Sequence, residues 1–369
     1  MKSEIKTALI VGIVIATGIG MISIVFSSFD EDVESTSTLT ETNSLSKIDK
    51  SKFKRAPDLV GIAHYLNTTP DELTKEIKDK VVLYDIWTYS CINCIRTLPY
   101  ITAWNDKYSD QGLLIIGIHS PEFEFEKDPE NVKMALDKHG IDYPVALDND
   151  METWKAFENR YWPRKYIADH EGYLRYDHIG EGDYQKTEKI IQQLLEERAT
   201  SLGIQMTSSE SLVDIEEFKH TMFRTPELYF GYKFAQNRNQ LGSDEGFQPG
   251  KIISYSEPEN IDLHKFYPTG DWKNYEDSME LVSEVGSIKL LYNAKEVNIV
   301  TDGAAEIEIF LDGEPLPTKY FGTDITLENT LKVTEPGLYN IINSENSSSH
   351  VMEIKITGKG FQIFTFTFG

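Results

Sequence analysis

One stretch decides the fold of this chain: Val81-Val82-Leu83-Tyr84-Asp85-Ile86-Trp87-Thr88-Tyr89-Ser90-Cys91-Ile92-Asn93-Cys94. Its first seven residues form an apolar run that is typical of a buried strand, interrupted by one carboxylate. A strand that delivers a Cys-x-x-Cys pair to the first turn of a helix is a common layout of thiol redox sites. Cys91 and Cys94 are the only cysteines of the chain, so the pair can form an internal disulfide, react with a thiol of another protein, or be inert.

The two cysteines are expected to have different roles. Cys91 falls where the strand ends and the helix begins, so free backbone N–H groups and the positive end of the helix dipole stabilise its thiolate. Cys94 lies one helical turn further on, where it can attack a mixed disulfide and release the partner. We therefore predict that Cys91 is the nucleophile and Cys94 the resolving thiol.

The redox group is expected to be the Cys91–Cys94 disulfide itself, with no other cofactor and no metal. A zinc site would need a second cysteine pair or a histidine pair at short spacing, and neither is present. Haem attachment would need a histidine directly after the second cysteine, where the chain has Ile95. Peroxide reduction of the peroxiredoxin type would need a Pro-x-x-x-Thr-x-x-Cys loop, which residues 85–91 do not supply.

Asp85 is a candidate catalytic carboxylate. By strand alternation it points to the face opposite Tyr84 and Ile86, six residues before the nucleophile. Burial would raise its pKa, and it could then accept the proton of the resolving thiol. The alternative is a structural carboxylate with a buried partner. His119, at the end of the next apolar run, is expected to be a hydrogen-bonding residue rather than a catalyst, and the acidic stretch 122–130 is expected to be a solvated loop.

From Phe53 to about Thr200, strand and helix patterns alternate, which indicates an α/β layered sheet. We expect strands at 81–87, 113–119 and around Val145, and two more strands flanking His170-Glu171-Gly172. Helices are expected at 91–108, 129–139, 151–158 and 184–198.

Past about Ser211 the pattern changes to short alternating runs separated by turn residues such as Asp312-Gly313 and Glu335-Pro336-Gly337. This pattern of short strands and turns predicts an all-β sandwich or jelly roll. Its aromatic residues could stack on a sugar, but most aromatic residues of a sandwich lie in its core. The residues concerned are Tyr229, Tyr232, Trp272 and Tyr275.

The N-terminus carries a stretch that could cross a membrane. Residues 8–26 are 19 uncharged, mostly apolar residues, with Lys2 and Lys6 before them and an acidic segment after them. This length and charge pattern predict one transmembrane helix with a cytoplasmic N-terminus and the remaining chain outside the cytoplasm. A cleaved secretory signal is the alternative, and it would export the domains as well. The net charge of −24 excludes a nucleic-acid partner in the absence of a basic patch.

These patterns predict five segments: a cytoplasmic stub and anchor at 1–29, a flexible acidic linker at 30–52, a redox domain at 53–200, a linker at 201–220 and a β-sandwich domain at 221–369. Residues 30–52 are rich in Ser, Thr, Asp and Glu, a composition that cannot bury enough apolar surface to fold.

The motifs resemble a known family. Asp85-Ile86-Trp87, the Cys-x-x-Cys and Pro99 resemble the thioredoxin signature. More narrowly, three segments resemble the extracytoplasmic redox region of DipZ-type proteins, within the TlpA-like branch: 87–100, 119–127 and 159–163. The likeness covers roughly Phe53 to the C-terminus, including Thr225-Pro226-Glu227 and the terminal Phe366-Thr367-Phe368-Gly369.

The resemblance implies a thioredoxin fold with a βα insertion, followed by a jelly roll like that of a carbohydrate-binding module. It also implies that Pro163 is a cis-proline that faces the cysteine pair and orients the incoming substrate. Substrate contacts are then expected at Trp87, Ile92, Asn93 and Trp162. DipZ-type proteins carry a multi-span electron-transfer domain, whereas this chain has one expected span, so its electron source is open and a membrane electron-transfer protein is one candidate.

The leading hypothesis is a membrane-anchored thiol–disulfide oxidoreductase that acts on protein thiols and disulfides outside the cytoplasm. The alternative is a non-catalytic surface protein whose β-domain binds a glycan or another protein. The direction of electron flow depends on the reduction potential of the pair, which the sequence does not give.

Overall fold

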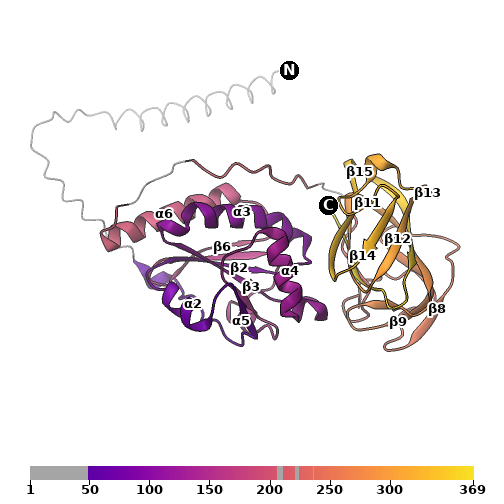
Figure 1. Cartoon of the computed structure of the whole chain (residues 1–369), viewed down its shortest axis with the longest axis horizontal. Helices are drawn as coiled ribbons and strands as arrows, with labels where there is room; N and C mark the ends of the chain where they lie inside the picture. The colour runs from indigo at the N-terminus through magenta and orange to yellow at the C-terminus, as the bar shows by residue number, and fades with distance from the viewer. Residues whose placement is uncertain (1–48, 206–210, 221–223, 236) are drawn as a thin grey trace, which may run out of the picture. The chain divides into compact units, whose positions relative to one another are not determined.

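The computed structural model describes residues 49–205, 211–220, 224–235 and 237–369 (Figure 1). The transmembrane helix expected at 8–26 and most of the acidic linker lie outside these residues. Within the described residues, none of the helices combines the length with the apolar composition that crossing a bilayer requires. Residues Lys50–Gly369 form one compact unit, which holds an α/β domain followed by a β-rich domain.

The α/β domain is built on a six-stranded sheet with the order β1-β4-β3-β2-β5-β6. β2 lies near its centre, parallel to β3 and antiparallel to β5. The strands are β1 (His64–Leu66), β2 (Val81–Trp87), β3 (Leu113–His119), β4 (Val145–Leu147), β5 (Arg164–Ala168) and β6 (Leu174–Ile179). The strands expected at 81–87 and 113–119 therefore form with the expected bounds, because both are apolar enough to be buried on two faces.

Helices cover both faces of this sheet (Figure 1). They are α2 (Pro70–Glu76), α3 (Ile92–Tyr108), α4 (Pro129–His139), α5 (Glu152–Ala156) and α6 (Tyr184–Leu202). Side chains of alternate β2 residues enter two separate cores. Val81, Leu83 and Trp87 pack with residues of α3, α4 and α6, whereas Val82, Tyr84 and Ile86 pack with residues of α2 and with Phe157. The side chains of β2 thus alternate between the two faces of the sheet, as expected around Asp85.

The helix expected at 151–158 is shorter than expected, and the one expected at 184–198 is longer. Met151 and Glu158 have positive φ angles of 57° and 53°, which the helical conformation does not allow, so α5 spans only Glu152–Ala156. The last helix continues to Leu202 and ends at Gly203 in the left-handed conformation (φ 67°) that glycine adopts readily.

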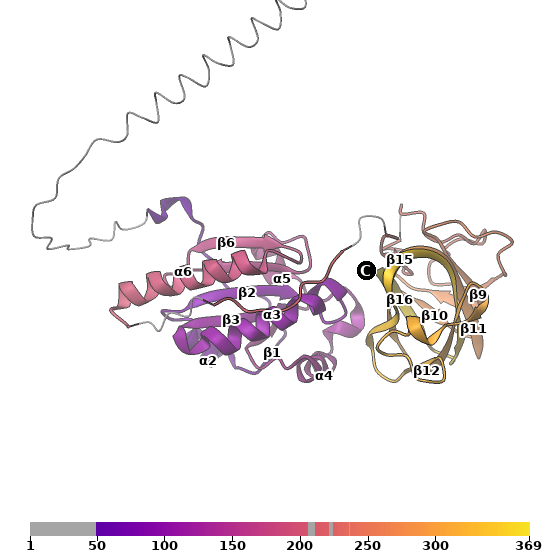
Figure 2. The same cartoon turned by 90° about the horizontal axis from the view of Figure 1, so that it is seen from above.

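The C-terminal domain is β-rich, as expected. Eight strands of its ten-stranded sheet follow the order β13-β12-β15-β11-β16-β10-β9-β8, while β14 pairs with β12 and β7 with β16. An additional pairing of β11 with β9 closes part of the sheet into a barrel-like form. Figure 2 shows the strong curvature of these strands. The elements are β7 (Leu228–Tyr229), β8 (Ile252–Tyr255), β9 (Phe266–Asn274), β10 (Met279–Leu281), β11 (Val285–Asp302), β12 (Ala305–Leu311), β13 (Glu314–Pro315), β14 (Thr330–Val333), β15 (Gly337–Thr357) and β16 (Gln362–Phe368).

Two of these strands differ from the expected short runs. β11 has 18 residues and β15 has 21, and they pair along most of their length. Register shifts between Ala294 and Glu296 and between Val297 and Asn298 interrupt the ladder. Such bulges bend a strand, so one long strand can contribute to opposite sides of a curved sheet. The jelly-roll arrangement itself stays a prediction.

Two of the four aromatic residues considered for sugar stacking are buried, whereas Tyr232 and Tyr275 are half-buried. Trp272 is fully buried and packs in the core of the β-domain. Tyr229 is only 6% exposed and stacks on Phe234, with 5.6 Å between the ring centroids. Trp272 and Tyr229 therefore stabilise the fold, as aromatic residues in a β-rich core usually do.

Ile354 tests the centre of this β-domain. It is fully buried on β15 and lies opposite Ile288 of β11 and Ile309 of β12. We expect Ile354→Ala to lower the free energy of unfolding of the β-domain by about 2–5 kcal/mol, because lost burial and the remaining cavity both contribute. Urea unfolding measures this loss. Val285→Ala, at a position that is 62% exposed, should change stability by less than about 0.5 kcal/mol. Equal effects of the two substitutions would contradict the assigned packing.

Candidate active site

Cys91 caps the helix that follows β2. It is the N-cap of α3, with extended backbone angles (φ −79°, ψ 113°), and its Sγ accepts a hydrogen bond from the backbone N–H of Cys94 at 3.3 Å. The side chain is partly exposed. A sulfur in this position faces the unpaired N–H groups of the first helical turn.

Cys94 is held inside the domain. It is 1% exposed and packs in the core between the sheet and α3. Burial raises the pKa of its thiol well above the usual value, and the sulfur of Cys91 raises it further. Both cysteines are free thiols in this structure. The geometry thus gives one accessible and one inaccessible sulfur, one turn apart.

Asp85 lies beneath this pair on β2 and is 1% exposed. Burial raises the pKa of its carboxyl to about 6, an effect that the ammonium of Lys165 partly opposes. Its Oδ1 has no hydrogen-bond partner among the described residues. Asp85 in turn contributes to the raised pKa of Cys94. The carboxylate therefore interacts electrostatically with the buried thiol.

Lys165 is a site residue that the sequence reasoning did not find. It is fully buried on β5, directly opposite Asp85 in the antiparallel ladder. Its Nζ donates a hydrogen bond to the carbonyl oxygen of Gly180 at 3.0 Å. Burial lowers the pKa of its ammonium, while Asp85 and Cys94 raise it. A lone lysine in an apolar strand, two residues after Pro163, was the signal that could have identified it.

The peptide bond between Trp162 and Pro163 is cis, as the resemblance implied. The indole N–H of Trp162 donates to the carbonyl oxygen of Ser120 at 2.9 Å, which fixes this ring beside the site. Trp162 lines a cavity of about 220 Å³ together with Cys91, Ile92 and Asn93. Three of the four expected substrate contacts thus surround one hollow next to the exposed sulfur.

Trp87 does not fit the expected role of substrate contact. Its side chain is fully buried, and its ring packs edge-on against His119 with 5.4 Å between centroids. A Cβ atom added to Gly117 would lie 3.0 Å from the indole Nε1, so the absence of a side chain on that neighbouring strand leaves room for the ring. Trp87 supports the site from within because it ends a strand that is buried on both faces.

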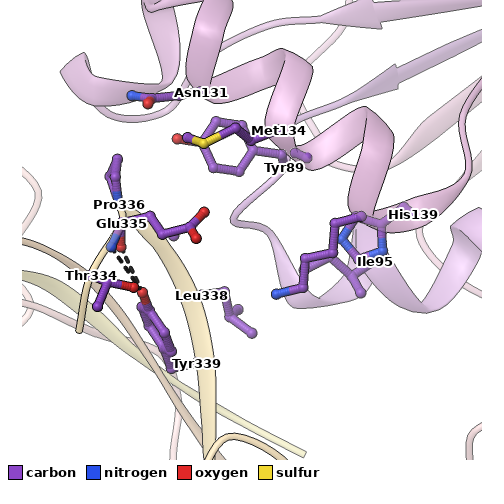
Figure 3. Close-up of a pocket in the computed structure, with 13 residues that line it drawn as sticks. Tyr89, Ile95, Asn131, Met134, His139, Thr334, Glu335, Pro336, Leu338 and Tyr339 are labelled. Atoms are coloured by element: carbon purple, nitrogen blue, oxygen red, sulfur yellow. Dashed lines mark hydrogen bonds between the residues drawn. The ribbon is translucent and has the colours of Figure 1, made fainter. Parts of the chain in front are cut away.

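A second cavity of about 400 Å³ lies on the other side of the loop that precedes Cys91. Figure 3 shows Tyr89 and Ile95 on one side of it, with Asn131 and Met134 of α4, and on the other side residues 334–339, which form a turn and the start of β15. The hydroxyl of Tyr339 on β15 donates to the carbonyl oxygen of Glu335 in the preceding turn at 2.7 Å. The loop that carries the nucleophile is therefore flanked by two hollows.

The acidic stretch 122–130 was expected to be a solvated loop, and for Glu126 this expectation is wrong. Its carboxylate is fully buried. It accepts hydrogen bonds from Ser90 and from the backbone N–H groups of Glu122 and Phe123. The sequence suggests an acidic, exposed segment here, but Ser90, 36 residues away, and two neighbouring backbone N–H groups supply the hydrogen bonds that the buried carboxylate needs.

His119 is buried and neutral. Its Nε2 lies 3.3 Å from the hydroxyl of Thr88, and its ring stacks on Tyr89 with 5.7 Å between centroids. Burial lowers its pKa to about 3. The expectation of a hydrogen-bonding residue agrees with this geometry.

The β-domain also contributes residues near the cysteines. The hydroxyl of Tyr229 lies 3.0 Å from Oε1 of Glu122 and 2.8 Å from Oε2 of Glu227, and these residues line the cavity beside Cys91. On α3, Arg96 donates to the carboxylate of Glu296 at 2.6 Å. Sequence patterns gave no sign of these contacts, because nothing in a local pattern indicates which distant residue faces it.

Comparison with known proteins agrees with this geometry. Residues 52–195 match the redoxin family model, and residues 225–369 match a model described as a thioredoxin-like C-terminal domain. Protein DipZ of Mycobacterium bovis is 36% identical over 318 residues, which cover 85% of this chain and 43% of that protein. The chain thus spans less than half the length of that relative.

Shorter relatives match the redox domain alone. Thiol-disulfide oxidoreductase YkuV of Bacillus subtilis is 34% identical over 143 residues, which cover 38% of this chain and 94% of that protein. A thioredoxin-like protein solved in solution in its oxidised form is 31% identical and covers 41% of this chain and 99% of its own, with a TM-score of 0.36. On the strength of the sequence relatives, residues 52–195 form a redoxin domain related to thiol-disulfide oxidoreductase YkuV, and the chain belongs to the thioredoxin-like proteins as a homologue of DipZ.

Proposed function

We propose that this protein is a thiol–disulfide oxidoreductase that works through a mixed disulfide with protein substrates. The observation that carries the proposal is the pairing of a partly exposed Cys91 at the start of α3 with a buried Cys94 one turn later. Relatives named as a thiol-disulfide oxidoreductase and as DipZ support the same activity.

In the reducing direction, the thiolate of Cys91 attacks one sulfur of a substrate disulfide. The substrate S–S bond breaks, a mixed disulfide forms, and the released substrate thiolate takes up a proton. Cys94 then loses its proton and attacks the sulfur of Cys91. The Cys91–Cys94 disulfide forms, the second substrate thiolate leaves, and two electrons have passed to the substrate. A reduced dithiol donor restores the pair, and oxidation of a substrate follows the same steps in reverse.

Asp85 is proposed as the acceptor of the Cys94 proton. A thiol whose pKa is raised by burial needs a base nearby, and a carboxyl with a pKa of about 6 is mostly ionised near neutral pH. Lys165 stabilises the ionised form of Asp85. Pro163 and the half-buried side chains that line the cavity beside Cys91 are proposed to hold the incoming segment.

We place the domains outside the cytoplasm, tethered to the membrane through residues 8–26. The apolar length of this stretch and the lysines before it support this location. The substrates are then exported proteins with thiols or disulfides, and a membrane electron-transfer protein is the proposed electron source.

The two thiols should differ in reactivity. In reduced protein, iodoacetamide should modify Cys91 on the order of tenfold faster than Cys94, because Cys91 is exposed and burial keeps Cys94 protonated. Peptide mass spectrometry after timed quenching gives both rates. In Cys91→Ser, the labelling of Cys94 should remain slow. Equal or faster labelling of Cys94 would overturn the assignment of nucleophile and resolving thiol.

Cys94→Ser should trap mixed disulfides with substrates, since the attacking thiol remains and the resolving thiol is absent. The full chain is expressed in intact cells, and captured proteins are identified on non-reducing gels. Exported proteins should be captured by Cys94→Ser and largely absent with Cys91→Ser. Wild-type protein should reduce insulin in the presence of dithiothreitol. Absence of capture together with absence of insulin reduction would contradict the oxidoreductase function and favour the binding-protein alternative.

Asp85→Asn should change both the pH dependence of turnover and stability. In wild type, the rate of mixed-disulfide resolution should rise as Asp85 ionises, with a midpoint near pH 6. The variant should lack this rise and be slower by about 10²-fold near pH 7, the lower end for a lost general base. Stopped-flow measurement of disulfide exchange against pH tests this expectation.

The stability effect has a defined sign. Because the folded pKa of Asp85 lies above its ordinary value, wild-type stability falls as pH rises from about 4 to 6. Asp85→Asn should therefore be more stable than wild type by about 1–3 kcal/mol at pH 8. Asp169→Asn is the matched control: Asp169 is equally buried, but hydrogen bonds from Lys50 and Tyr173 lower its pKa, so its loss should reduce stability at pH 8. Reduced stability of Asp85→Asn with unchanged exchange would make Asp85 structural.

A further inference from the structure

We propose that Glu126 is a positioning residue for Cys91: its buried carboxylate joins the loop in front of the nucleophile to the loop after β3 and so holds the sulfur at the N-terminus of α3. This inference rests on the proposed role of Cys91 as the attacking sulfur.

The geometry around Glu126 consists of hydrogen bonds on both sides of one carboxylate. Oε1 accepts from the hydroxyl of Ser90 at 2.6 Å and from its backbone N–H at 3.3 Å. Oε2 accepts from the backbone N–H groups of Glu122 at 2.6 Å and of Phe123 at 2.9 Å. Two loops that are more than 30 residues apart in sequence are thus joined by one side chain.

The backbone donors around Glu126 require acceptor oxygens on its side chain, and these hydrogen bonds oppose the burial that raises the pKa of its carboxyl. The carboxylate faces three backbone N–H groups, which can only donate, and one hydroxyl. A glutamine would point its amide NH₂ at N–H donors on one side, and an aspartate is one methylene too short to reach both loops. The neighbouring Lys127 pairs with Glu124 instead. The titratable groups that face the carboxylate are Tyr89 and Glu122, and burial raises the pKa of both side chains.

Ser90 passes this constraint to the nucleophile, because it directly precedes Cys91 in the chain. The backbone N–H of Cys91 donates to the carbonyl oxygen of Thr88 at 3.3 Å, which closes the turn that contains Ser90. The extended N-cap conformation of Cys91 and its contact with the N–H of Cys94 follow this turn. If Ser90 moves, the sulfur loses its alignment with the helix N-terminus.

The same carboxylate also positions the cavity beside Cys91. Ser90, Glu122 and Phe123 line this cavity, and all three are hydrogen-bonded to Glu126. A single buried residue, which touches neither the cavity nor the sulfur in any described contact, thus fixes the wall of the cavity and the sulfur relative to each other.

The test is the rate of Cys91 alkylation by iodoacetamide against pH in the full chain. Glu126→Gln and Glu126→Asp should each slow this rate by about two- to fivefold at pH 7, the effect expected when one charge loses a helix N-terminus. Ser90→Ala should slow it in the same direction. The double variant Glu126→Gln with Ser90→Ala should be no slower than Glu126→Gln alone, because both changes break one connection.

Glu188→Gln is the matched control. Glu188 is a carboxylate that is 1% exposed and accepts from Tyr108 and Lys107 at the far end of the same helix α3. The Glu188→Gln substitution should lower the melting temperature without changing the alkylation rate of Cys91 in folded protein. If Glu126→Gln does not fold, the alkylation rates of Glu126→Asp and Ser90→Ala test the proposal instead.

Three results would overturn the proposal: unchanged alkylation in the Glu126 variants, a wild-type rate in Glu126→Asp, which would assign the effect to charge alone, or an equal change in Glu188→Gln. Alkylation reports on Cys91 itself, whereas insulin reduction by wild type reports on the proposed function. A protein that fails in insulin reduction but shows the expected alkylation pattern would contradict the function and leave the role of Glu126 intact.

Discussion

The burial of β2 on both faces is the constraint on which the redox site depends. A strand in this position must be apolar, and all seven residues of β2 are buried, yet one of them is Asp85. The carboxylate is tolerated because Lys165 lies opposite it on the next strand. The end of the same strand fixes where α3 begins, and so places Cys91 at the edge of the domain and Cys94 inside it. The position of β2 therefore determines the capping of α3 by Cys91 and the unequal exposure of the two thiols.

The elements that the sequence predicted well are those whose signal is local. β2, β3 and α4 have the expected bounds, because apolar runs and a proline at the helix start define them without reference to the remaining chain. The cysteine pair and Pro163 were also identifiable from local motifs. α5 was predicted too long because positive φ angles at Met151 and Glu158 leave no mark in the hydrophobic pattern.

The parts of the site that the sequence did not predict all depend on partners distant in the chain. Lys165 is notable only when its position opposite Asp85 is known. In the sequence, Glu126 is one of several acidic residues in a loop, and only the structure shows that Ser90 and backbone N–H groups donate hydrogen bonds to it. The strands of the β-domain were expected to be short, and β11 and β15 are long because bulges let them bend rather than end. Local patterns describe elements, whereas contacts between elements decide which charges can be buried.

The position of Asp85 near Cys94 also ties electron transfer to proton transfer. A negative Asp85 disfavours the thiolate of Cys94, and by reciprocity a negative Cys94 disfavours ionisation of Asp85. When the disulfide is reduced, the sulfur of Cys94 takes up a proton as well as electrons, because burial raises the pKa of its thiol well above the usual value. Reduction of the pair therefore draws a proton to a sulfur that is 1% exposed, and the reduction potential should depend on pH throughout the range in which Cys94 stays protonated. The reducing power of the pair would in this way follow the acidity of its surroundings without any change of fold.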